Sequence, residues 1–137
     1  QLSRTALFSV AVPTGTSADI VYTLPAGSTF RESAILTYAY GGLTPQPAVT
    51  GAGAGAGVDL SQDTQPDDTV FAVAITLDST GTAVSGLATD YLADLRVDEE
   101  FIVASALETV AQTPRTIIAT SSAQSNPLGA ISVVFRP

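Results

Sequence analysis

The sequence contains no lysine, histidine, cysteine, methionine or tryptophan, and its only asparagine is Asn126. Without histidine, lysine or cysteine, the familiar dyads and triads that activate a nucleophile have no general base. Zinc sites built from cysteine and histidine are excluded for the same reason. Disulfides are absent, so the redox compartment cannot be read from cysteine usage. The sequence therefore predicts that the protein is not an enzyme, and it predicts no catalytic residue and no cofactor-binding residue.

Positive charge is also scarce, since five arginines stand against thirteen aspartates and glutamates and the net charge is −8. A surface of this sign repels a polyphosphate chain, so nucleic acid is not an expected partner. Anionic lipid is disfavoured by the same argument. The longest apolar run, residues 71–77, is interrupted by Thr76 and is far too short to cross a bilayer, so no membrane span is expected.

Apolar residues make up 45% of the sequence. A chain of 137 residues with this composition is expected to fold as a single domain, residues 1–137. Apolar and small or polar residues alternate in five segments, which predicts strands with a buried face: 8–12, 20–24, 34–40, 69–78 and 130–135. Short strands separated by turn residues predict a mainly β fold, an antiparallel β-sandwich or jelly-roll-like barrel.

The segment 86–112 supports two interpretations. Leu87, Tyr91 and Leu95 have helical spacing, and Asp98 is placed to cap a helix that carries acidic residues in its first turn. Residues 101–109, by contrast, alternate as a strand does. The fold prediction therefore allows one or two short helices within 86–112.

Residues 43–68 are expected to form a long Gly/Ala/Pro-rich loop, because the alternation stops there and prolines and glycines replace it. Within this segment, residues 51–57 alternate glycine and alanine, a pattern that also permits a silk-like strand. The sequence favours the loop, either flexible or in contact with a partner. Residues 1–5 are expected to form a short N-terminal arm.

Acidic residues in the predicted loop suggest calcium as a candidate ligand, because calcium is bound by several oxygen atoms and tolerates irregular loops. The candidate calcium ligands are Asp59, Asp63, Asp67 and Asp68. A second acidic group lies further along the chain, where spacing by four would place the acids on one face of a helix. It comprises Asp90, Asp94, Asp98, Glu99 and Glu100.

Missing catalytic groups, a small β fold, an arm and a long loop favour a structural subunit of a repeated extracellular or virion assembly, with a capsid coat or decoration protein as the first expectation. Its partners would be copies of itself, as a homo-oligomer, and other coat or surface proteins. The chain opens at Gln1 without an initiator methionine, consistent with a removed leader. The alternatives are a secreted carbohydrate- or receptor-binding module and a pilus or appendage subunit. The candidate interface residues are Gln1, Leu2, Ser3, Arg4, Gly51, Gly53, Gly55, Gly57 and Arg136.

Overall fold

The computed structural model describes residues 19, 21, 23, 26–27, 36–38, 41–54, 57–76, 81–96, 99–122 and 127–137. Within these residues the chain forms β-strands and no helix, which confirms the mainly β prediction. The strands are β1 Thr44–Pro45, β2 Val49–Ala54, β3 Val58–Asp59, β4 Gln62–Thr64, β5 Thr69–Thr76, β6 Ala83–Ser85, β7 Ala88–Arg96, β8 Glu99–Leu107, β9 Gln112–Arg115, β10 Ile118–Thr120 and β11 Pro127–Arg136.

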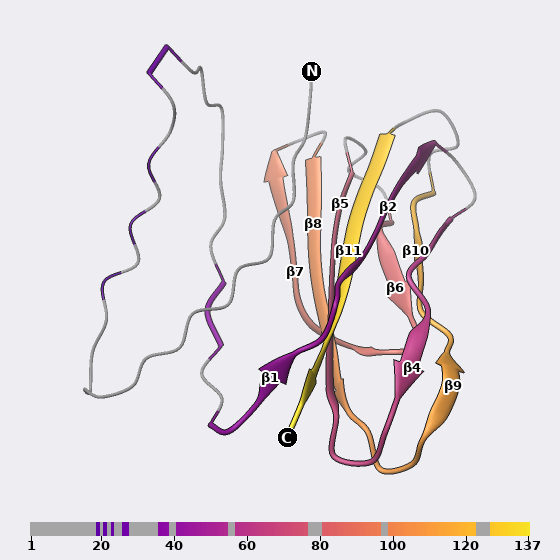
Figure 1. Ribbon diagram of the computed structural model, residues 1–137. Helices are drawn as coiled ribbons and strands as arrows, with labels where there is room; N and C mark the ends of the chain where they lie inside the picture. Colours follow the sequence, from indigo (N-terminus) through magenta and orange to yellow (C-terminus); the bar gives the residue numbers. More distant parts are fainter. Residues whose placement is uncertain are drawn as a thin grey trace.

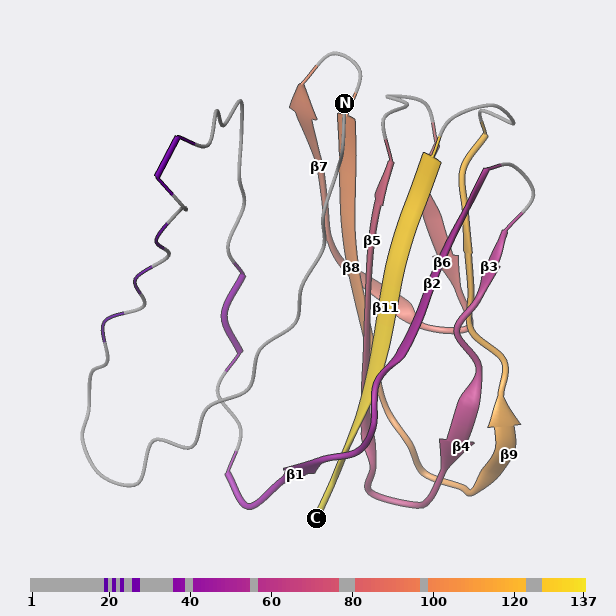
Figure 2. The same ribbon diagram turned by 45° about the horizontal axis from the view of Figure 1, so that its top comes forward.

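The strands form one large sheet and two small ones, and every pairing is antiparallel. The large sheet has the order β1–β11–β5–β8–β7, and β2 also pairs with β11. The small sheets are β3–β10–β6 and β4–β9. Figures 1 and 2 show β3, β6 and β10 packed beside the large sheet, with β4 and β9 at one end of the molecule. The arrangement is consistent with a β-sandwich.

The strands pair in a nested order along the chain. β1 and β2 pair with β11, β3 pairs with β10, β4 with β9 and β5 with β8. Partner positions therefore converge, from Thr44 opposite Arg136 to Thr76 opposite Glu100. This part of the chain is a long two-stranded antiparallel ribbon. Three further ladders complete the described sheets. The β5–β11 ladder joins two parts of the ribbon, and β6 and β7, which lie between β5 and β8 in the chain, pair with β10 and β8. A rolled antiparallel ribbon is the jelly-roll principle.

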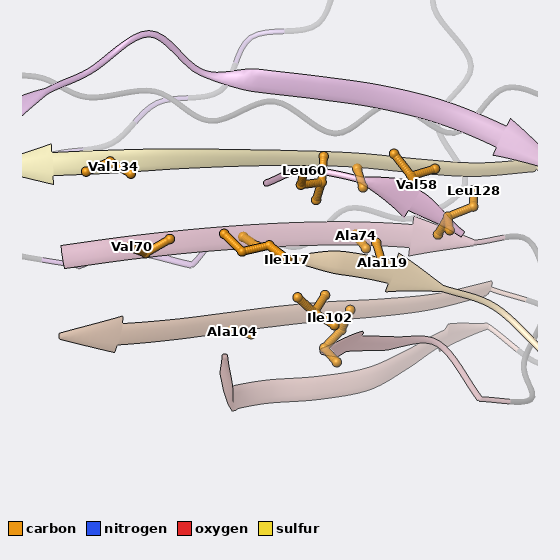
Figure 3. Packing of buried hydrophobic residues seen from close by; sticks show 13 residues of the cluster. Val58, Leu60, Val70, Ala74, Ile102, Ala104, Ile117, Ala119, Leu128 and Val134 are labelled. Atoms are coloured by element: carbon orange, nitrogen blue, oxygen red, sulfur yellow. The ribbon is translucent and has the colours of Figure 1, made fainter. Parts of the chain in front are cut away.

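The core lies between the large sheet and the strands that pack on it (Figure 3). Alanine and valine make up much of it, and small side chains of this kind allow two layers to pack closely. Burial of the aliphatic members stabilises the fold by about 25 cal/mol for each Å² of apolar surface removed from water. The cluster comprises Val58, Leu60, Val70, Ala72, Ala74, Val84, Ile102, Ala104, Ile117, Ala119, Leu128, Ala130 and Val134.

β5 is buried on both of its faces. The side of β5 that carries Val70 and Ala72 contributes to the core cluster. Phe71, Val73 and Ile75 are also buried, although they alternate with those residues and lie on the other face of the sheet, here called the outer face. On the outer face, the ring of Phe71 lies 4.8 Å from that of Tyr38 and 5.7 Å from that of Phe135, measured between centroids. Burial on both sides is consistent with the continuous apolar run 70–75 between Thr69 and Thr76.

Of the two interpretations of 86–112, the structure shows the strand, because the described part of this segment contributes β7, β8 and the first residue of β9 and contains no helix. Gly86, with a φ of +89°, lies in the turn before β7. The loop expected at 43–68 instead contains β1, β2, β3 and β4, with the glycine–alanine run paired to β11 over residues 51–54. The strand interpretation of that run, which the sequence disfavoured, holds there.

The strand predicted at 69–78 is confirmed as β5, and the alternation at 130–135 falls within β11. In the two predicted strands between residues 20 and 40, the structure describes residues 21, 23 and 36–38, and none of these lies in a strand. The remainder of those two segments, the segment 8–12 and the arm 1–5 lie outside the described residues.

Candidate functional site

The four aspartates predicted to bind calcium do not gather at one point of the fold. Asp59 ends β3, and its Oδ1 accepts a hydrogen bond of 2.9 Å from the Ser61 backbone N–H. The side-chain and backbone hydrogen bonds of Ser61 lower the pKa of Asp59. Asp63 is exposed in the middle of β4, and Asp67 is exposed in the following turn with a φ of +69°. In the described part of the chain, no three acidic side chains gather closely enough to hold a metal ion.

Asp68, the fourth candidate, forms an ion pair with Arg136 and is fully buried. Arg136 Nε donates to Oδ1 of Asp68 at 3.0 Å, and Arg136 Nη2 donates to Oδ2 at 2.9 Å. Asp68 Oδ2 also accepts the Gln65 backbone N–H at 2.8 Å. The Arg136 hydrogen bonds hold the pKa of Asp68 below its ordinary value of 3.8, against the opposing effect of burial. Arg136, predicted as an interface residue, therefore binds within its own chain.

A second buried carboxylate, Glu108, lies close to Asp68. Glu108 is 2% exposed, and its Oε2 accepts hydrogen bonds from Arg115 Nη1 at 3.0 Å and from Gln112 Nε2 at 2.9 Å. Arg115 Nη2 also donates to the Gly86 carbonyl, which ties the network to the turn before β7. Neither Glu108 nor its pairing was predicted, because an isolated glutamate after a strand carries no sequence signal of burial.

The two buried carboxylates mark the place where the rolled ribbon bends from the β4–β9 sheet into the large sheet. The Asp67 N–H donates to the Glu108 carbonyl at 2.8 Å, and the Glu108 N–H donates to the Asp68 carbonyl at 2.8 Å. These bonds join the turn before β5 to the turn after β8. The charged groups here therefore stabilise a corner of the fold, since an ionised carboxylate is buried only when it is paired.

The second acidic group in the sequence does not form one helical face, because its described members lie in two paired strands. Glu99 and Glu100 are buried at the start of β8, and Glu100 Oε2 accepts the Thr82 backbone N–H. Asp90 and Asp94 are exposed in β7. Asp98 lies outside the described residues.

Two of the glycines predicted as interface residues lie at close approaches within the chain: Gly51 and Gly57. Gly51 and Gly53 lie in β2, opposite Ala130 and Leu128 of β11. A β-carbon added to Gly51 would overlap Cγ1 of Val58 in β3. Glycine at this position therefore lets β3 pass close to β2.

Gly57 has a φ of +147°, and an added β-carbon would lie 3.1 Å from Cγ2 of Ile118. A residue with a side chain would be strained at this φ and crowded by Ile118, so glycine is the residue that fits in the turn before β3. The remaining predicted interface residues lie outside the described part of the chain: Gln1, Leu2, Ser3, Arg4 and Gly55.

Exposed apolar and aromatic groups gather at β7, the strand at one end of the large sheet (Figures 1 and 2). Tyr91 and Leu92 are 43% and 51% exposed. Tyr38, 42% exposed, donates its hydroxyl proton to Oδ2 of Asp90 at 3.1 Å. Tyr91 also packs edge-on against Phe101, with ring centroids 6.5 Å apart.

A register shift lies beside Asp90. Thr89 stands opposite Ala104 and Tyr91 stands opposite Val103, so Asp90 is the extra residue of a β-bulge. Such bulges redirect side chains at sheet edges.

The structure describes no helix that is long and apolar enough to span a membrane. Comparison of the chain with known proteins finds no matching family model, no matching curated protein and no matching solved structure.

Proposed function

We propose that the protein is a structural subunit of a repeated extracellular or virion assembly, and that it acts as a coat or decoration protein that contributes contacts and no chemistry. The observation that carries this proposal is the rolled antiparallel ribbon, in which partner residues converge from Thr44 opposite Arg136 to Thr76 opposite Glu100. Jelly rolls of this type are a common architecture of viral capsid domains. The inference from fold to function is an analogy, so it needs support from the surface and from the charged groups.

The charged groups of the described chain support a structural role. The two carboxylates that are most deeply buried, Asp68 and Glu108, are both held by arginines at a corner of the fold. Neither is arranged as one of two opposed acids in a cleft, which carboxylate-based hydrolysis requires. Asp68 and Glu108 are thus paired with arginines at a corner of the ribbon, which favours a structural role for both carboxylates.

The mass of the protein in solution tests this proposal. Light scattering coupled to size exclusion should give a multiple of the 13.9 kDa monomer that increases with concentration, and electron microscopy should show a closed oligomer, shell or filament. A mass equal to the monomer at every concentration would contradict a self-assembling subunit. Addition of a host particle to the monomer would then test the decoration form of the proposal.

The edge at β7 favours a second candidate function, a secreted carbohydrate-binding module. Tyr38 and Tyr91 expose aromatic surface close to the Asp90 carboxylate, and sugars bind by stacking on aromatic rings and donating hydroxyl protons to acids. A glycan array distinguishes the two functions. Binding that is lost in Tyr91→Ala, with a monomeric mass, would favour this module over the structural subunit.

A further inference from the structure

Two tyrosines and a carboxylate lie together on the outer face of the large sheet, at its β7 end. Tyr91 stands opposite Val103, which pairs in turn with a residue of the outer face in β5. Opposite residues of an antiparallel pair share a face, so Tyr91 is on the outer face too. The ring of Tyr38 packs against Phe71 on this face, and its hydroxyl reaches the carboxylate of Asp90. We call these three residues the Tyr38–Asp90–Tyr91 site.

The carboxylate of this site is available to a ligand. Asp68 and Glu108 are each paired with an arginine. Asp90 is exposed, and within the described part of the chain it forms no ion pair and accepts one hydrogen bond, from the Tyr38 hydroxyl to Oδ2. This bond orients the carboxylate and leaves Oδ1 to a ligand. A negative charge at such a place attracts a cationic group and repels an acidic one.

Tyr91 supplies a ring surface beside that charge. The ring packs edge-on against Phe101 at 6.5 Å between centroids, and 43% of the residue remains exposed. The contact with Phe101 supports the ring from within the sheet. Aromatic faces bind the apolar face of a sugar ring, and they also attract ammonium groups. A ligand that carries both a sugar ring and a positive charge therefore matches both members of the site.

We propose that the Tyr38–Asp90–Tyr91 site binds a glycan with free amino groups, of the glucosamine type, with an ammonium group on Asp90 Oδ1 and a sugar ring on Tyr91. This inference rests on the second candidate function, the carbohydrate-binding module, and names its ligand. A neutral glycan would leave the charge of Asp90 without a partner. An acidic glycan would be repelled by Asp90 and by the net charge of −8.

Three oligosaccharides of equal length and linkage test the ligand, built from glucosamine, N-acetylglucosamine and glucose. Isothermal titration calorimetry should give a dissociation constant for the glucosamine oligomer that is about tenfold lower than for the other two, since only its amino groups are charged. The difference should disappear at an alkaline pH that deprotonates the sugar amines. Equal affinities for the three oligomers would overturn the ligand assignment while leaving the carbohydrate-binding function intact.

Asp90→Asn removes the charge and keeps an oxygen that accepts the Tyr38 hydroxyl proton. It should raise the dissociation constant of the glucosamine oligomer by about tenfold and leave that of the glucose oligomer unchanged. Asp94→Asn is the matched control, because Asp94 is exposed in the same strand and its replacement changes the net charge equally. This control should bind as the native protein does. Circular dichroism confirms that both variants are folded.

The control separates a specific site from general attraction between a cationic glycan and an acidic protein. An equal loss of affinity in Asp90→Asn and Asp94→Asn would show general attraction and would overturn the site. Absence of binding to all three oligomers would overturn the ligand assignment. A glycan array without any binding would overturn the carbohydrate-binding function as well.

Discussion

Asp68 binds Arg136 through both carboxylate oxygens, with Nε 3.0 Å from Oδ1 and Nη2 2.9 Å from Oδ2. The two residues lie 68 positions apart in the sequence. The pair joins the turn before β5 to the end of β11, and so it fixes the corner at which the ribbon bends.

Acid should destabilise the protein through this pair. The Arg136 hydrogen bonds hold the pKa of folded Asp68 below its ordinary value of 3.8. A group with a lowered folded pKa contributes stability that is complete above its unfolded pKa and is lost as the pH falls through the folded pKa. The free energy of unfolding should therefore decrease as the pH falls below about 4. Urea unfolding followed by circular dichroism at a series of pH values measures this loss.

Asp68→Asn isolates the contribution of Asp68, because it keeps the shape of the side chain and cannot ionise. At pH 7 this variant should be less stable by about 1–3 kcal/mol, since the Arg136 hydrogen bonds to a charged acceptor are weakened. Its stability should change less between pH 7 and pH 3 than that of the native protein. Parallel pH curves for the two proteins would show that other carboxylates account for the acid effect.

The Glu108 network should depend on both of its members. Glu108→Ala leaves Arg115 and Gln112 without their acceptor and should cost about 3 kcal/mol of unfolding free energy. Replacing both residues, by Glu108→Leu with Arg115→Leu, removes the buried charges together and should cost less than the single substitution. Chemical denaturation of Glu108→Leu, Arg115→Leu and the double variant measures the coupling. Additive losses would show that the two side chains do not stabilise each other.

Gly51→Ala should destabilise the protein by about 1–3 kcal/mol, because the added β-carbon overlaps Val58 and one strand must move. Gly41→Ala is the matched control, since a β-carbon there meets nothing within 4 Å. Its effect should stay within about 0.5 kcal/mol.

Adding Val58→Ala to Gly51→Ala removes the overlapping methyl group. The pair should therefore lose less stability than the sum of the two single variants, as measured by thermal unfolding. Strict additivity would show that the close approach of β2 and β3 is not what requires glycine at position 51.

Much of the strand structure follows from local pattern. The alternation at 69–76 identified β5, and the alternation at 130–135 lies within β11, because apolar residues at every second position report a buried face. The β2 strand was missed because glycine and alanine carry little apolar signal, and their role becomes visible only when Val58 is placed against Gly51. The helical spacing of Leu87, Tyr91 and Leu95 allowed a helix in the prediction. The two bulges of β7 explain this, because each interrupts the alternation by which a strand is recognised.

The candidate sites were harder to predict. Four aspartates close in sequence suggested a calcium site, but whether they converge depends on strand pairing over distances that the local pattern does not encode. Asp68 is instead buried beside Arg136, which lies at the other end of the ribbon. Tyr91 and Leu92 are adjacent in the chain, and their common exposure depends on β7 being the last strand of its sheet.

The nested pairing also has a consequence for how the chain folds during synthesis. β5 can pair with β8 as soon as both have left the ribosome, but β1 and β2 must wait for β11, the last strand to emerge. Closing such long loops costs entropy before the distant contacts form, so folding dominated by these pairings is slow. Until β11 arrives, the edge of β5 that pairs with it stays open, and a chaperone or a neighbouring nascent chain can reach its unpaired backbone groups.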